Sequence, residues 1–110
     1  MKNFALRTLR IVAFDLAEAG LWYEEQQPDA GLADALDREA EEAILRLRTD
    51  ALHHRIRFRD VRRAPMKRFA SIGIYYVVRG ANVIVIAVFH DARDPRLLRG
   101  RRREVVGDLR

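Results

Sequence analysis

The spacing of apolar residues is helical in the first half of the chain. Between Leu9 and Gln27, apolar positions recur every three or four residues, which is typical of one face of a helix. Pro28 disfavours helical backbone at the residue before it and ends this segment. A second, cleaner stripe runs over residues 30–48, and Asp29 is the expected N-cap of that helix. A connection this short predicts an antiparallel helical hairpin over residues 9–48.

The spacing becomes strand-like in the second half. Residues 57–90 are rich in Val, Ile, Tyr and Phe, and Gly80 and Asn82 supply a tight turn, which predicts two or three antiparallel strands. Pro65 cannot donate to a strand ladder, so its strand is expected at an edge or bulged. The unbroken apolar run at 83–89 predicts a central strand covered on both faces.

These elements together predict one α+β domain over residues 1–110. Its expected parts are a short first strand within residues 3–9, the helical hairpin, and an antiparallel β-sheet of about three to four strands on which the hairpin packs. Asp94 and Pro95 suit the start of a C-terminal turn or helix. The tail at 96–110 is basic, and a short helix that frays is expected there.

The first helix carries more apolar surface than one contact with a core requires. Phe14 and Leu21 lie a third of a turn or more from the main apolar stripe, and Ile11 and Trp22 are expected on yet another side. Part of this surface is therefore expected to meet a partner.

The two halves of the chain carry opposite charge. The net charge of +5 divides into −5 over residues 1–50, from 6 Lys and Arg against 11 Asp and Glu, and +10 over residues 51–110, from 15 against 5. The basic half could face nucleic acid or an acidic protein, because its field attracts both. An apolar share of 49% is that of a globular protein. The longest apolar stretch is broken at Arg79 and Gly80, so no membrane span is expected.

Candidate catalytic chemistry is sparse. The chain has no cysteine, which excludes disulfides and thiolate metal sites and is consistent with a reducing compartment. His90 ends the apolar run, while His53 and His54 lie in another connection, so neither a metal site nor a cofactor is expected. No nucleophilic triad is recognisable, and His90 is interpreted as closing a strand. Asp91 and Asp94 are interpreted as turn residues, and Arg93 could pair with either of them.

Four motifs in order along residues 15–95 resemble the ParE branch of the RelE/ParE toxin superfamily. The segment "DLAEAGLWYEEQ" resembles the family's first helix, and "DVRRAPMKRF", "IYYVV" and "VIVIAVFHDARDP" resemble three of its strands. Phe69-Ala70-Ser71 departs from the Phe-Pro-Tyr of many relatives. The matching residues are Asp15, Leu16, Glu18, Ala19, Trp22, Tyr23, Val61, Arg62, Phe69, Val88, His90, Arg93, Asp94 and Pro95.

The resemblance implies a bacterial cytoplasmic toxin of a type II toxin–antitoxin module, with the fold described above. A cognate antitoxin would cover the surplus apolar residues of the first helix, and the toxin would act by binding DNA gyrase. The candidate antitoxin-binding residues are Ile11, Phe14, Leu21 and Trp22.

Two alternatives remain open. RelE-like relatives cut mRNA on the ribosome, which requires cations and proton transfer, and the candidates for that reaction are Arg62, Arg68, His90 and Arg93. No Tyr, His or Trp follows His90, which favours the binding toxin over the ribonuclease. The second alternative is an inactive relative that only binds an antitoxin.

Overall fold

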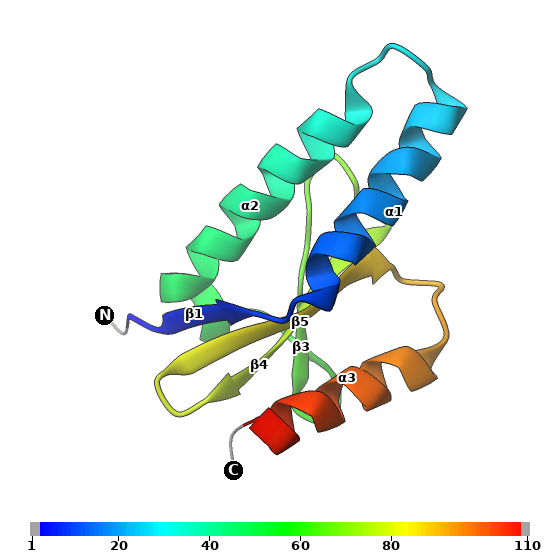
Figure 1. Ribbon diagram of the computed structural model, residues 1–110. Coiled ribbons are helices and arrows are strands. Elements are labelled where there is room, and N and C mark those ends of the chain that lie inside the picture. Colours follow the sequence, from blue (N-terminus) through cyan, green and yellow to red (C-terminus); the bar gives the residue numbers. More distant parts are fainter. Residues whose placement is uncertain (1–2, 109–110) are drawn as a thin grey trace.

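The structure is a computed structural model that describes residues 3–108, and in it one β-sheet carries helices on both faces (Figure 1). Helices α1 (Ile11–Gln26) and α2 (Leu32–Asp50) form a hairpin on one face, and α3 (Pro95–Asp108) lies against the other. The fold class predicted from the sequence is confirmed. In chain order the elements are β1 (Ala5–Thr8), α1 (Ile11–Gln26), α2 (Leu32–Asp50), the 3₁₀ turn η1 (Ala51–His53), β2 (Ile56–Phe58), β3 (Val61–Ala64), β4 (Ile72–Arg79), β5 (Asn82–His90) and α3 (Pro95–Asp108).

The sheet contains the predicted first strand and four antiparallel strands, and it is mixed because the first strand joins it in parallel. Its order is β1-β5-β4-β3-β2, with β1 parallel to β5 and the other pairs antiparallel. The first strand joins in parallel because the helical hairpin lies between it and the later strands. The prediction for Pro65 was wrong: β3 ends at Ala64 and lies between β2 and β4, so the proline follows the ladder and removes no donor from it.

The predicted helical hairpin is confirmed, but the predicted cap of its second helix was wrong. The apolar stripe of α2 is buried through Leu36, Ala40, Ala43 and Leu47. The helix begins at Leu32, after Gly31, whose φ of 68° is left-handed and suits a residue without a side chain. Asp29 lies too early to cap α2, because the turn continues for two more residues.

A helix on each face divides the apolar interior into two cores. The first lies under α1 and α2 and includes Leu36, Tyr76 and Val85, and the second lies under α3 and includes Ile86 and Val105. The predicted double covering of residues 83–89 is therefore confirmed, and α3 is the second cover. The tail forms an ordered helix to Asp108, and residues 109–110 lie outside the described chain.

Strand β5 contains a β-bulge in its second half. Tyr75 lies opposite Ala87 and Tyr76 opposite Val85, so Ile86 has no register partner on β4. Ile86 and Ala87 consequently both belong to the core under α3, although they are neighbours in the chain. The alternation then resumes, with Val88 in the core under α1 and α2.

Candidate partner-binding site

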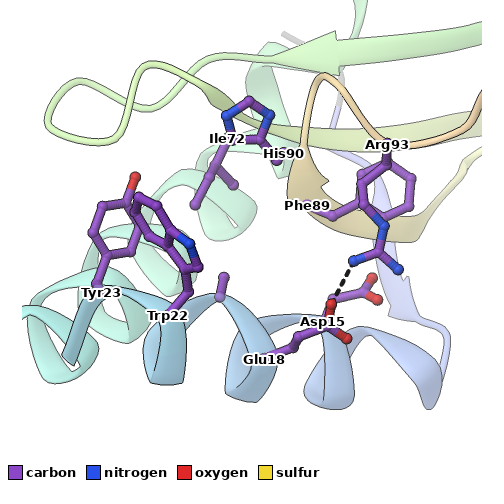
Figure 2. A pocket seen from close by; sticks show the side chains of 9 residues that line it. Asp15, Glu18, Trp22, Tyr23, Ile72, Phe89, His90 and Arg93 are labelled. Carbon is purple, nitrogen blue, oxygen red and sulfur yellow. Dashed lines mark hydrogen bonds and ion pairs between the residues drawn. The ribbon is translucent and has the colours of Figure 1, made fainter. Parts of the chain in front are cut away.

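A cleft of about 370 Å³ lies between α1 and the end of β5 (Figure 2). Two of the four sequence motifs meet in it, one from the first helix and one from the closing strand. Its floor is mostly apolar, with charged groups at one side. The lining residues are Asp15, Glu18, Ala19, Trp22, Tyr23, Ile72, Phe89, His90 and Arg93.

Helix α1 supplies one wall of the cleft through residues on one of its faces. Asp15, Glu18, Ala19 and Trp22 are spaced i, i+3, i+4 and i+7, which places them in a row along the helix. Tyr23 packs edge-on against Phe69, with ring centroids 5.0 Å apart, and Trp22 packs edge-on against Tyr23 at 4.9 Å. The core thus anchors Tyr23, which in turn positions the exposed indole of Trp22.

His90 is the last residue of β5, where the sequence placed it. Its Nδ1 accepts a hydrogen bond from the backbone N–H of Ala92 at 3.0 Å, which helps to form the turn after the strand. In the neutral ring, this bond leaves the hydrogen on Nε2. The side chain therefore closes the strand and also lines the cleft.

Arg93 has a partner that the sequence did not indicate. Its guanidinium forms an ion pair with Glu18 of α1 at 2.6 Å and lies 5.5 Å from the ring centroid of Phe89. The predicted pairing with Asp91 or Asp94 was wrong, because those carboxylates pair with Arg63 and Arg96 respectively. Asp94 does accept a hydrogen bond from the N–H of Arg96 at 2.9 Å, so its predicted role at the start of α3 is confirmed.

An ion pair between α1 and α3 closes the charged end of the cleft. Asp15 is 7% exposed, and Arg101 reaches it from the opposite side of the sheet with one N–H···O contact of 2.8 Å and a second, shorter one. Both side chains of the pair also form hydrogen bonds with the backbone of β5, past the point where β1 ends. The N–H of Val88 donates to Asp15 at 3.0 Å, and Arg101 donates to the carbonyl of Ile86 at 3.1 Å. Two side chains thus bond backbone groups that a longer first strand would have paired.

The exposed apolar residues of α1 lie on one side of the helix, beside the cleft, and together they are called the strip. At 100° per residue, the four positions fall within an arc of about 100°, so Ile11 and Trp22 are neighbours of Phe14 and Leu21 and do not form a separate side as expected. All four lie open to solvent, and Trp22 belongs to both the strip and the cleft. The exposed fractions are 37% for Ile11, 65% for Phe14, 60% for Leu21 and 54% for Trp22.

The four residues considered for RNA cleavage do not line one site. His90 and Arg93 share the cleft. Arg62 instead donates to the carbonyl of His54 at 2.7 Å, between β3 and the segment after η1. Arg68 borders a different hollow, beside α2.

A second charged cluster lies at the end of β5, toward the core under α3, and sequence reasoning missed it. Asp91 accepts hydrogen bonds from Nε and Nη2 of Arg63, at 2.9 and 2.8 Å, and a short one from the hydroxyl of Tyr75. Gly73 leaves room for this arrangement, because a Cβ there would approach Nε of Arg63 to 2.6 Å. Burial, together with the bond to Asp91, raises the pKa of Tyr75 to about 12. The hydroxyl therefore stays protonated and donates at neutral pH.

Among the side chains that the structure describes, no three from His, Asp or Glu are grouped so that they could hold a metal ion. None of the helices described is both long enough and apolar enough to cross a membrane.

Comparison with known proteins agrees with this geometry. A solved structure described as the chromosomal ParDE TA system from P. aeruginosa superposes with a TM-score of 0.67 and 17% sequence identity, covering 79% of this chain and 95% of that one. At this identity, the likeness supports the fold. No curated protein matches significantly. The family model described as the ParE toxin of type II toxin-antitoxin system, parDE, matches residues 10–95, and the chain therefore belongs to the ParE toxin family.

Proposed function

We propose that this ParE-family toxin acts by binding DNA gyrase and that a cognate antitoxin neutralises it by covering α1. The observation that supports antitoxin binding is the strip of Ile11, Phe14, Leu21 and Trp22 beside the cleft. Large exposed apolar side chains that gather on one side of a helix mark protein interfaces. Their spacing along α1 fits a partner segment that inserts apolar side chains along the helix and into the cleft.

Gyrase inhibition is inferred from family membership. A binding toxin needs no arrangement of catalytic groups, and of the four candidates for RNA cleavage only His90 and Arg93 line the cleft. The ribonuclease alternative is less well supported, since Arg62 bonds a backbone carbonyl and Arg68 borders another hollow.

Antitoxin binding is tested by placing charge on the strip. Because Phe14 and Leu21 are 65% and 60% exposed, Phe14→Asp with Leu21→Asp is expected to leave the fold intact and to weaken antitoxin affinity by about 100-fold in a calorimetric titration. Leu45→Asp is the matched control, because Leu45 is 50% exposed on α2 and lies outside the strip. Unchanged affinity in the double variant would disprove the assignment of this face.

The cellular target is tested with two assays on the purified chain. We expect inhibition of DNA supercoiling by purified gyrase and no cleavage of ribosome-bound mRNA. Cleavage that His90→Ala abolishes would establish the ribonuclease instead. Activity in neither assay, with antitoxin binding retained, would identify an inactive relative.

A further inference from the structure

We propose that the outer surface of α3 and the adjoining β2–β3 turn bind double-stranded DNA through its phosphate backbone. This surface is called the basic face, and its helix α3 lies on the other side of the sheet from α1 and α2 (Figure 1). Its exposed arginines without an ion pair among the described side chains are Arg59, Arg99 and Arg103.

Helix periodicity separates an apolar and a cationic side of α3. Leu97, Leu98 and Val105 pack toward the sheet. Arg96, Arg99 and Arg103 follow one another at i, i+3 and i+7, so they form a row along the outer side of the helix, and all three are exposed.

Phe58, at the end of β2, contacts arginines of both the β2–β3 turn and α3. The guanidinium carbon of Arg59 lies 5.6 Å from the centroid of the Phe58 ring, and that of Arg99 lies 5.8 Å from it. One arginine of the β2–β3 turn and one of α3 therefore meet at the same ring.

Most of this charge is not neutralised within the molecule. Arg96 pairs with Asp94, while Arg79 and Arg102 share Asp60. Among the side chains that the structure describes, none forms an ion pair with Arg59, Arg99 or Arg103. Binding of a polyanion would reduce the electrostatic repulsion among these arginines.

The basic face suits nucleic acid better than an acidic protein. Protein interfaces have an apolar centre from which charge is depleted, whereas DNA interfaces are polar and strongly positive. The described part of α3 exposes no large apolar side chain. Ile56 is exposed on β2, but it lies on the other face of the sheet. Its register partner Arg62 lies opposite Tyr76, which belongs to the core under α1 and α2.

A duplex fits better than a single strand, and B-form DNA better than RNA. Single-strand binding uses open aromatic rings on which bases stack, but the ring of Phe58 is half-buried between two arginines. The major groove of B-DNA admits a helix with a cationic outer side, and that of A-form RNA is too narrow. With contacts to phosphates alone, binding is independent of base sequence.

The test is fluorescence anisotropy of a labelled DNA duplex of arbitrary sequence, titrated with the purified chain between about 50 and 200 mM salt. We expect saturable binding that weakens steeply with salt. Arg99→Ala with Arg103→Ala should weaken binding by about 10-fold or more and lower the salt slope by about 2, close to 0.9 per lost phosphate contact. The matched control is Arg38→Ala with Arg48→Ala, which removes two exposed arginines from α2.

Several outcomes would overturn the proposal. Equal loss in the control variant would show that net charge alone is responsible. Tighter binding to duplex RNA, or to a poly-glutamate peptide, would assign the basic face to those partners, and absence of binding to the DNA duplex at low salt would remove its assigned role. The experiment contains neither gyrase nor antitoxin, so its result is independent of the target assays described above.

Discussion

At the scale of single residues, Asp91 joins three strands of the sheet. Its carboxylate accepts from Arg63 on β3 and from Tyr75 on β4, while its own N–H, just past the end of β5, donates to the carbonyl of Ser71 at 2.9 Å. Burial alone would raise the pKa of Asp91, but the hydrogen bonds from Arg63 and Tyr75 outweigh burial and lower it. The folded state therefore favours the charged carboxylate.

This lowered pKa has a consequence for acid stability. The contribution of Asp91 to the free energy of unfolding is present above the unfolded pKa of about 3.9 and is lost as the pH falls through the lower folded value. Asp91→Asn should reduce the free energy of unfolding at pH 7 by about 2 kcal/mol and make it less dependent on pH below 5, as measured by urea denaturation. Asp37→Asn, at an exposed position on α2, should change neither quantity. Parallel pH profiles for Asp91→Asn and the unchanged protein would contradict this role.

Sequence reasoning succeeds at this scale where a residue acts on its own neighbours. Asp94 was predicted because an aspartate followed by proline starts a helix locally. Partner choice across the sheet was not predictable: Arg63 and Asp91 are 28 positions apart, and Arg93 pairs with Glu18, 75 positions away. Several arginines compete for each carboxylate, and only the packed strands select one.

At the scale of elements, the position of α3 depends on more than its apolar side. Arg101 connects α3 to Asp15 of α1 and to the carbonyl of Ile86 on β5. Its side chain is 11% exposed and that of Asp15 is 5% exposed, so both charges are removed from water. Loss of one partner would leave the other charge buried without compensation.

Removal of Arg101 should therefore cost far more than removal of a neighbouring arginine. Arg101→Ala is expected to lower the free energy of unfolding by about 3 kcal/mol, measured by urea denaturation. Arg103→Ala, in the same helix but exposed, should change it by less than about 0.5 kcal/mol. Equal effects for the two variants would mean that the ion pair with Asp15 contributes no stability.

Periodicity predicted the helical hairpin and the two long strands, because their apolar patterns are long and regular. It did not predict an ordered α3, because five of its residues are arginines and its attachment depends on Asp15, far away in the chain. Strands β2 and β3 have only three and four residues, too few for a period to be distinguished. The site was predicted in part: the strip on α1 follows from sequence, whereas the cleft requires β5 to lie beside that helix.

At the scale of the whole molecule, β5 is the element on which the others assemble. It pairs with β1 and β4, and both cores include its side chains. Strand β2, by contrast, lies at the sheet edge with three residues that are exposed or partly exposed. Opening of β5 requires loss of both cores, whereas β2 contacts only the core under α3, through the partly buried Phe58.

Hydrogen exchange should reveal this order. Amides of β5 are expected to exchange only through global unfolding, with opening free energies on the order of 5–10 kcal/mol. The opening free energies of the β2 amides are expected to be lower by at least about 2 kcal/mol. Mass spectrometry of exchanged peptides that cover residues 56–58 and 82–90 measures both in one sample. Equal exchange rates in the two strands would contradict the assignment of β5 as the last element to open.

The bulge at Ile86 has a consequence for changes in chain length. In a regular strand, deletion of one residue turns every later side chain to the opposite face. In β5, deletion of Ala87 would instead restore strict alternation, with Val85 and Val88 still toward α1 and α2 and with Ile86 and Phe89 still toward α3. The bulge is therefore the one point within this strand where the chain can lose a residue while every remaining side chain keeps its core.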